Sequence, residues 1–249
     1  MLRALEAELT KLKRATLPLW TLATVCGAPT LSNVFATANS GWTETTLWST
    51  FVGLGPMSMG TWYGILLFGL ITAFLFGREY SEGVATNVLT TPTRREYFVL
   101  AKFAVLAGWV AVLALLAVVA QVVWASALGL DGATWSSVWS CLGDMLTVAL
   151  LIFLTLPLVA LVAVMSRGVF APMIFSAFGF AAGMLGGIAG WGDWLPWAMP
   201  TSIAGSFMGP MGLASQTKLD GGSWVIAVGV FVLGLAALLY WVNHADSKS

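Results

Sequence analysis

The stretch FGREYSEGVATNVLTTPTRREYFVLAKF, residues Phe76 to Phe103, is an island of charge in an otherwise apolar sequence. Long apolar runs lie directly before it and directly after it. Ordinary connections have a median of about four to six residues, so this one is unusually long. The pattern predicts a structured loop over 78–102, on one side of a membrane, that receives a soluble partner. Its charged residues are Arg78, Glu79, Glu82, Arg94, Arg95, Glu96 and Lys102.

The composition of the whole chain indicates a membrane protein. Hydrophobic residues make up 59% of the 249 residues, charged residues make up 9%, and the mean hydropathy is +0.89. Soluble domains carry about 25% charged residues. The formal net charge is zero, which argues against a nucleic-acid partner. Cys26 and Cys141 have apolar neighbours and are interpreted as packing residues rather than a disulfide or a metal pair.

Six apolar segments are long enough to cross about 30 Å of hydrocarbon. The predicted fold is therefore an all-α membrane protein with six transmembrane helices and an amino-terminal amphipathic interfacial helix over 1–15. Leu2, Leu5, Leu9 and Leu12 form the apolar stripe of that first helix, which alternatively is a soluble cytoplasmic helix packed on a partner. The predicted spans cover residues 16–36, 56–77, 103–128, 145–165, 169–190 and 223–242.

Basic residues are distributed unevenly between the two sides of this topology. With the amino terminus in the cytoplasm, the outer segments carry only Lys218. The positive-inside rule therefore predicts a multi-pass protein of the cell membrane with both termini in the cytoplasm. The inner segments carry the other ten: Arg3, Lys11, Lys13, Arg14, Arg78, Arg94, Arg95, Lys102, Arg167 and Lys248.

Missing residue types narrow the possible functions. Apart from Asp144 at the outer edge of the fourth span, the predicted spans contain no Asp, Glu, Lys, Arg or His, which disfavours an ion-coupled carrier. The single histidine, His244, disfavours a serine–histidine or metal-dependent intramembrane protease. No G-x-x-x-x-G-K-[ST] phosphate loop occurs. We therefore expect no catalytic residue, no metal and no cofactor on this chain.

The charged island reads as a helix–turn–helix, with an ordinary solvated loop as the alternative. Its pattern E-x-x-x-G-x-x-x-x-x-L-x-x-P-x-x-R is formed by Glu79, Gly83, Leu89, Pro92 and Arg95. This pattern resembles the permease subunits of type-2 ATP-binding cassette transporters, in particular the bacitracin- and lantibiotic-type six-span permeases of bacteria. In architecture the resemblance covers the whole chain.

The resemblance implies that this loop is a coupling element that sits in a groove of a separate ATPase subunit, which binds ATP and Mg²⁺. Glu79 would brace the loop by pairing with Arg94, Arg95 or Lys102, and solvation is the alternative for each charge. The residues implied in coupling are Glu79, Glu82, Gly83, Thr86, Val88, Leu89, Pro92, Arg94 and Arg95.

Small and polar residues mark two of the spans. Gly179, Gly183 and Gly187 are spaced by four, which lets two helices approach closely, either as a dimer seam between two permease chains or within one bundle. The resemblance favours the seam. Thr21, Thr24 and Ser32 are the candidates for lining a translocation path, unless their hydroxyls bond their own helix carbonyls.

The segment over 191–222 is too long for a turn and too apolar for a solvated loop. It predicts an outer re-entrant or interfacial element with a short helix near 201–211, serving as a cap or as an anchor that fixes tilt.

Together these patterns predict the permease subunit of an ATP-driven exporter. It would act as a homo- or heterodimer with two ATPase subunits, and it would move an amphipathic compound such as an antimicrobial peptide, a lipid or a drug. The alternative is a non-transporting scaffold or sensor subunit that docks a soluble partner through the same loop.

Overall fold

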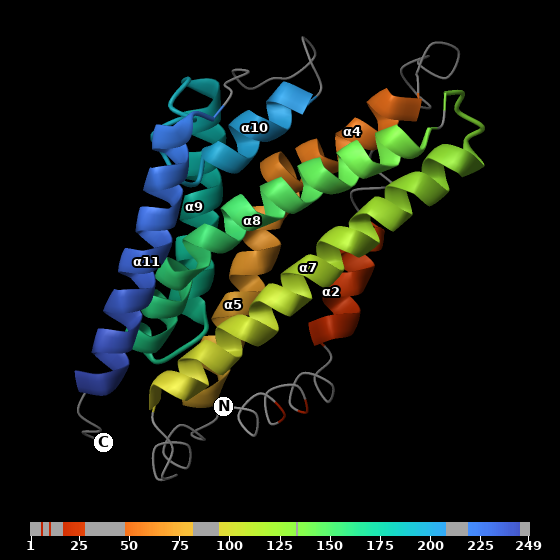
Figure 1. Ribbon diagram of the computed structural model, residues 1–249. Helices are drawn as coiled ribbons and strands as arrows, with labels where there is room; N and C mark the ends of the chain where they lie inside the picture. The colour runs from red at the N-terminus through yellow and green to blue at the C-terminus, as the bar shows by residue number, and fades with distance from the viewer. Residues whose placement is uncertain are drawn as a thin grey trace.

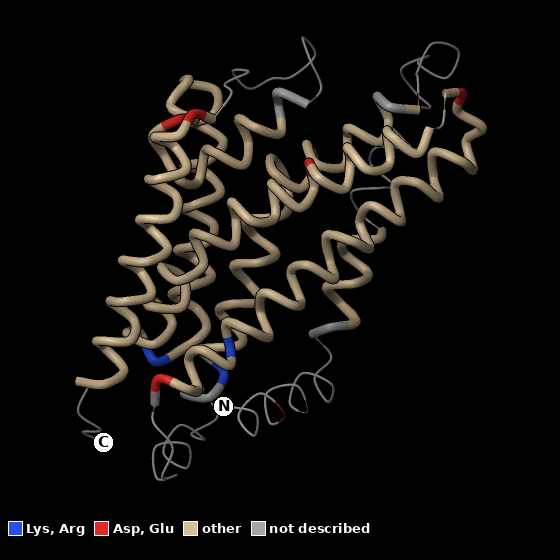
Figure 2. Tube along the Cα trace, viewed as in Figure 1, with Lys and Arg blue, Asp and Glu red and all other residues tan. Residues whose placement is uncertain are grey.

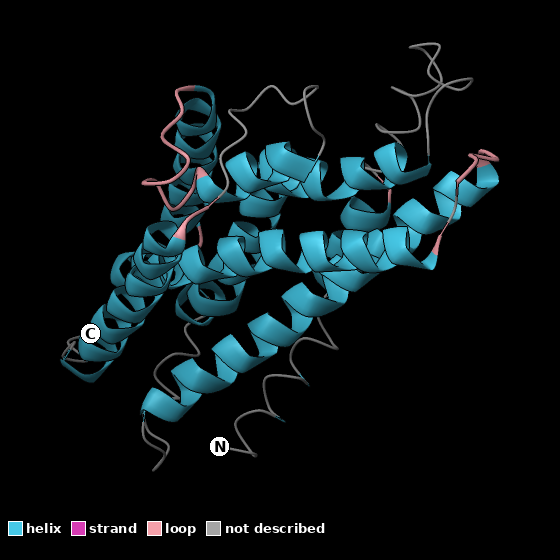
Figure 3. Ribbon diagram, turned by 45° about the horizontal axis from the view of Figure 1, so that its top comes forward, coloured by secondary structure: helices cyan, strands magenta, loops and turns pink. Residues whose placement is uncertain are grey.

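The computed structural model describes residues 6, 10, 17–27, 48–81, 95–132, 134–207 and 219–244, which form helices joined by turns and loops, with no strand among them (Figure 3). The prediction of an all-α protein is confirmed for this part of the chain. In order, the elements are α2 (Leu17–Cys26), α4 (Trp48–Ser58), η2 (Met59–Tyr63), α5 (Gly64–Ser81), α7 (Arg95–Ala127), α8 (Trp135–Ser166), α9 (Phe170–Ile188), α10 (Met199–Phe207) and α11 (Gly221–His244).

Five helical stretches are long and apolar enough to cross a membrane, and they correspond to the last five predicted spans. They are Phe51–Arg78, Glu96–Ala127, Trp135–Ser166, Phe170–Ile188 and Gly221–His244. Of the predicted first span, the structure describes only α2 and Gly27, so the count of six stays a prediction. The interfacial helix over 1–15 lies outside the described residues except for Glu6 and Thr10.

Several helices extend beyond the predicted limits. α7 has 33 residues and α8 has 32, which at 1.5 Å per residue is about 50 Å, well over the thickness of the hydrocarbon layer. The prediction placed their polar first turns in loops because a hydropathy window excludes them. The connection predicted over 78–102 is correspondingly shorter, since α5 runs to Ser81 and α7 begins at Arg95.

Side-chain caps fix where two of these helices begin. Thr134 and Ser137 form a reciprocal capping box at the start of α8. The carboxylate of Asp220 accepts hydrogen bonds from the Ser223 N–H at 2.8 Å and from its hydroxyl at 2.9 Å, at the start of α11. The backbone hydrogen bond from Ser223, followed by the one from its hydroxyl, lowers the pKa of Asp220.

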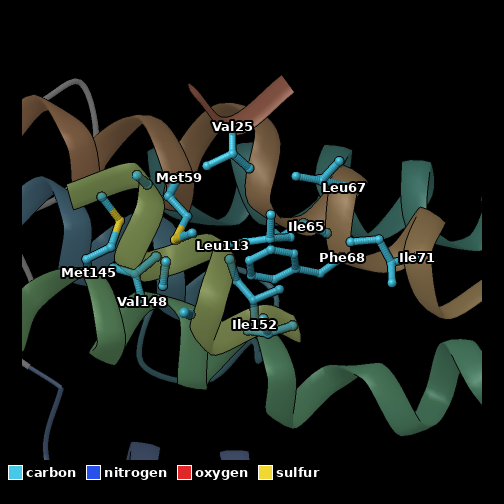
Figure 4. Close-up of a cluster of buried hydrophobic side chains, with 14 of the residues drawn as sticks. Val25, Met59, Ile65, Leu67, Phe68, Ile71, Leu113, Met145, Val148 and Ile152 are labelled. Atoms are coloured by element: carbon cyan, nitrogen blue, oxygen red, sulfur yellow. The ribbon is translucent and has the colours of Figure 1, made fainter. Parts of the chain in front are cut away.

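α8 lies at the centre of the bundle. Its most apolar window is 67% buried, against 17% for α11, which lies at the edge. α8 packs against α4, α5, α7, α9, α10 and α11. Figure 4 shows Met145, Val148 and Ile152 of α8 directed at Met59 and Phe68.

α4, η2 and α5 form one continuous helical stretch that bends where they meet (Figure 1). Pro56 lies inside α4 and has no N–H to donate to the carbonyl of Val52. The Cys141 thiol of α8 donates to that carbonyl at 3.6 Å. The five-residue π-helix η2 follows directly, and π-helical turns occur frequently at functional sites.

The described lysine and arginine residues lie at one end of the bundle, where Glu79 and Glu96 also lie, and most of the described aspartates lie at the other end (Figure 2). Arg78, Lys102 and Arg167 lie at what we call the basic end, formed by the end of α5, the start of α7 and the α8–α9 turn. Asp131, Asp193 and Asp220 lie in the connections at the opposite, acidic end. This separation has the form that the loop charges predict, and the side of the membrane that each end faces stays a prediction.

Candidate functional site

The basic end carries both stems of the predicted coupling loop. α5 takes the chain out of the bundle with Glu79 in its last turn, and α7 returns it from Arg95. The positions of these two residues fit the loop boundaries, and their role in coupling stays a prediction. The other predicted coupling residues lie outside the described part of the chain: Glu82, Gly83, Thr86, Val88, Leu89, Pro92 and Arg94.

The two stems are tied together by a group of four residues that we call the stem clasp: Leu75, Phe76, Lys102 and Phe103. The Lys102 Nζ donates a hydrogen bond of 2.6 Å to the carbonyl oxygen of Leu75. It also lies 5.5 Å from the centre of the Phe76 ring. The rings of Phe76 and Phe103, which bracket the charged island, are 5.3 Å apart. The two ends of the loop are therefore in contact where they join the helix bundle.

Lys102 is the most constrained charge of the basic end. Only 5% of it is exposed, and burying an ammonium group is costly unless it is paired. The carbonyls near the carboxyl end of α5 carry the negative end of the helix dipole, and the face of the Phe76 ring is also negative. Both features attract the ammonium group, so the lysine holds α7 against α5.

An aromatic cluster extends the clasp into the bundle. Phe103 of α7 lies 6.3 Å from Phe153 of α8 and 6.3 Å from Phe231 of α11, both nearly edge to face. Phe153 and Phe231 are 5.6 Å apart. Ring contacts therefore connect the clasp to four helices, α5, α7, α8 and α11. The sequence analysis missed this cluster, because a phenylalanine inside an apolar run carries no local signal of its partners.

Backbone contacts complete the basic end. A methyl group on Gly77 would lie 2.5 Å from the carbonyl oxygen of Gly168, so α5 meets the α8–α9 turn backbone to backbone. Arg167 caps α8 with a positive φ of 52°, which is uncommon outside glycine. The Asn243 Nδ2 of α11 donates to the Glu96 carboxylate of α7 at 3.0 Å. Contacts at the basic end thus involve the carboxyl ends of α5, α8 and α11 and the start of α7.

The two described path residues of the first span make different hydrogen bonds. Thr21 is buried, and its hydroxyl accepts a hydrogen bond of 3.3 Å from the Trp109 indole of α7. The Thr24 hydroxyl donates to the Trp20 carbonyl of its own helix at 2.8 Å, which fits the alternative that the sequence left open. The role of Thr21 and Thr24 in lining a path stays a prediction. Ser32 lies outside the described residues.

Thr24 does border a groove. This apolar groove has a volume of about 400 Å³ and lies between α2, η2, α5 and α9. Trp62 on its wall is 54% exposed. The hydroxyl of Ser176, also in the wall, donates to the Pro172 carbonyl of its own helix at 2.8 Å. The hydroxyls of Thr24 and Ser176 are thus satisfied within their own helices, and most of the groove's lining is apolar. Its lining residues are Thr24, Trp62, Tyr63, Leu66, Leu67, Leu70, Met173 and Ser176.

The glycine face of α9 makes its close contacts within one chain. A methyl group on Gly179 would lie 3.0 Å from the Trp197 indole nitrogen. One on Gly183 would strike the Trp197 carbonyl oxygen. Gly187 is buried as well. These contacts of Gly179 and Gly183 fit the alternative that the sequence left open, packing within one bundle, and the dimer seam stays a prediction.

Comparison with known protein sequences indicates the family to which this chain belongs. The sequence profile of the ABC-2 family transporter proteins matches residues 4–183, which is most of the chain. The bacitracin transport permease protein BCRB of Bacillus licheniformis is 40% identical over 47 residues, which is 19% of this chain and 23% of that protein. No solved structure matches the chain at a significant level.

Proposed function

This chain belongs to the ABC-2 transporter family, and we propose that it is the membrane permease of an exporter driven by a separate ATPase subunit. The ATPase binds ATP and Mg²⁺, and it docks on the loop between α5 and α7. This chain supplies the route through the membrane and no catalytic group. The described residues contain no group of three or more His, Cys, Asp or Glu side chains that could hold a metal ion.

The stem clasp is the observation that carries this proposal. If a docked ATPase moves the loop, the motion reaches the membrane helices only when the two ends of the loop are held rigidly. The bond from Lys102 to the Leu75 carbonyl and the contact of Phe76 with Phe103 close that base. Rigid-body movement of a docked partner would then shift α5 and α7 together.

The proposed substrate is an amphipathic compound such as an antimicrobial peptide, a lipid or a drug. One support is the short match to a protein named for bacitracin transport. A second is the groove between α2, α5 and α9, whose apolar wall lies at membrane depth. A compound with apolar parts would reach such a groove from the bilayer.

The permease is proposed to act as a dimer with itself or with a second permease. Since the glycines of α9 are filled from within the chain, the exposed face of α9 is the surface left for pairing. Phe170 is 84% exposed, Ile174 69% and Phe178 63%. Leu19 and Trp20 of α2 are exposed as well.

Co-purification with an ATPase tests the function. The probe is a candidate ATP-binding cassette ATPase subunit from the source organism, with bacitracin as the first trial substrate. We expect Val88→Asp and Glu82→Ala to reduce ATPase binding or substrate-stimulated hydrolysis, because both changes fall in the loop and outside the spans. Ser136→Asp, at the exposed start of α8 on the acidic end, is the matched control and should behave like the wild type.

Two results would contradict the proposal. Normal binding and transport by both loop variants would make the loop an ordinary solvated connection. ATPase binding without any substrate that stimulates hydrolysis or crosses the membrane would favour the scaffold or sensor alternative.

A further inference from the structure

The apolar groove between α2, η2, α5 and α9 is followed, along the same side of α5, by a positive charge at the basic end. Gly69 of α5 lies against α9, and Gly77 lies against the α8–α9 turn. Leu70 and Arg78 each follow one of these contact residues by one position. Both therefore lie about 100° round α5 from its contact with α9, on the same side of that contact. The groove that Leu70 lines thus leads along α5 to Arg78.

Arg78 is held against the apolar surface between the groove and the basic end. Its guanidinium group lies 5.2 Å from the centre of the Phe74 ring. Phe74 precedes it by one helical turn, and Leu70 precedes Phe74 by another. Side chains of a helix tilt toward its amino terminus, which for α5 is the direction of the groove. The attraction between a cation and an aromatic face therefore holds this charge near the end of the groove.

Arg167 brings a second positive charge to the same place. Arg78 and Arg167 each lie one residue from the close backbone approach of Gly77 to Gly168. Arg167 ends α8 with a φ of 52°, at a position where helices usually carry glycine. The backbone alone would favour glycine there, so the arginine indicates a use for its side chain.

The two arginines lie at the depth of the lipid headgroups. Arg78 is the last residue of the apolar stretch Phe51–Arg78, and Arg167 lies directly before the stretch Phe170–Ile188. The basic end is the predicted cytoplasmic side, and the cytoplasmic leaflet has a negative surface potential. Basic pockets between spans on that side are suited to anionic headgroups.

The distance from Arg78 to the groove suits a lipid chain. At 1.5 Å per residue, Leu70 and Leu66 of the lining lie about 12 Å and about 18 Å from Arg78 along α5. The hydrocarbon of one leaflet is about 15 Å thick, which is half of the whole layer. An acyl chain whose phosphate group lies at Arg78 therefore reaches the groove.

We propose that an anionic phospholipid binds here, with its phosphate group at Arg78 and Arg167 and one acyl chain in the groove. We call this the lipid site. Two neighbouring arginines attract an anionic headgroup. The groove accepts a hydrocarbon chain because the hydroxyls of Thr24 and Ser176 bond within their own helices. Binding at the lipid site requires neither an ATPase nor transport, so it does not rest on the proposed function.

The lipid site and the surface proposed for pairing lie on different sides of α9. Met173 lines the groove. Ile174 and Phe178, which are exposed, follow it by one and five positions, so they lie about 100° and about 140° further round the helix. A lipid in the groove thus leaves the pairing surface open to a second permease.

Native mass spectrometry of the purified full-length chain tests the headgroup. The probe is dioleoyl phosphatidylglycerol, and dioleoyl phosphatidylcholine is the lipid without net charge. We expect tighter binding of phosphatidylglycerol. Arg78→Gln and Arg167→Gly should each weaken it about fivefold, which is the effect of one basic residue near an anionic lipid.

Matched variants separate loss of charge from loss of structure. Arg167→Gly introduces the residue that the backbone favours, so its effect would come from the missing charge. Arg167→Lys keeps the charge and should bind phosphatidylglycerol like the wild type. Lys218→Gln removes the one basic residue of the predicted outer segments and should also bind like the wild type.

A chain-length series tests the groove. Dihexanoyl phosphatidylglycerol has the same headgroup and should bind far more weakly, because each buried methylene group adds to the affinity. Leu66→Trp fills part of the groove and should weaken binding of the dioleoyl lipid alone. Leu146→Trp in α8 is the control, since Leu146 is 39% exposed, Leu66 is 37% exposed, and only Leu66 lines the groove.

Three results would overturn the lipid site. They are equal binding of the two dioleoyl lipids by the wild type, wild-type binding by both arginine variants, and equal binding of the long-chain and short-chain phosphatidylglycerols. The first and third use only the wild type, so they decide the question even if a variant does not fold. Any of these results beside normal substrate-stimulated hydrolysis would leave the proposed function standing. Selective, chain-dependent lipid binding by a chain that no ATPase joins would support the lipid site and count against that function.

Discussion

At the scale of single residues, the environment of Lys102 distinguishes a structural charge from a solvated one. From the sequence it is one of three candidate partners of Glu79, beside Arg94 and Arg95, with solvation as the alternative. In the structure its ammonium group bonds the Leu75 backbone and faces the Phe76 ring. The contacts of this ammonium group depend on the relative position of α5 and α7, whereas the contacts of a solvated side chain do not.

We predict that Lys102→Met uncouples the protein more than it unfolds it. Removing the buried ammonium group also removes its desolvation cost, which offsets part of the lost hydrogen bond. The bond across the stems is lost, however, so substrate-stimulated ATP hydrolysis should fall while ATPase binding persists. Lys102→Arg keeps the charge and should retain part of the stimulation. A variant Lys102→Met with full stimulation would show that the clasp does not transmit motion.

A second residue-scale prediction concerns Cys141. Its thiol donates to the Val52 carbonyl, which has no helical donor because Pro56 lacks an N–H. Cys141→Val should lower the free energy of unfolding by about 1 kcal/mol, since it leaves a buried acceptor unpaired. Cys141→Ser keeps a donor and should be nearly neutral. Thermal denaturation in detergent measures both, and equal stability of the two variants would argue against this bond.

At the scale of elements, the glycines of α9 illustrate how one pattern serves different contacts. A small-residue stripe allows close approach and does not specify the partner. Here the partner is the segment over 195–204, which follows α9 along the same chain. A local partner has a high effective concentration, because little chain entropy is lost in closing so short a connection.

We therefore predict that Gly183→Ala destabilises the single chain. The new methyl group would meet the Trp197 backbone, and overpacking of this kind costs about 1–3 kcal/mol. Gly229→Ala in α11 has open space and should be neutral or slightly stabilising. Solubility after heating, followed by size-exclusion chromatography, compares them. If Gly183→Ala lost only the dimer and kept monomer stability, the original seam interpretation would be correct after all.

At the scale of the whole molecule, charge separation and helix alternation describe one topology. The described helices alternate in direction, so the connections fall at the basic end and the acidic end in turn. Arginine and lysine gather at one end and aspartate at the other. The positive-inside rule then assigns the basic end to the cytoplasm, which is where an ATPase is available.

We predict that cysteines at Ser81 and Ser136 label from opposite sides of the membrane. Ser81 ends α5 at the basic end, and Ser136 lies in the first turn of α8 at the acidic end. In the background without native cysteines, an impermeant maleimide added outside intact cells should reach only the cysteine at Ser136. Labelling of both from the outside would reject the topology.

The sequence by itself determined the solvent, the helices and the location of the loop. Hydropathy and charge are summed over windows of about 20 residues, so these sums do not depend on knowing which residues are in contact. All five long apolar helices were therefore predicted. The island between Phe76 and Phe103 was found for the same reason.

Only the tertiary structure decided which faces meet. Three sets of contacts join residues from different parts of the chain. They are the bond between Lys102 and Leu75, the aromatic cluster around Phe103, and the contact of Gly60 with Pro200 and Ala204. Every span is apolar on all sides, because both lipid and protein interior are apolar, so the amphipathic pattern that reveals the buried face of a soluble helix is absent. Packing of side chains, rather than their polarity, selects the partners here.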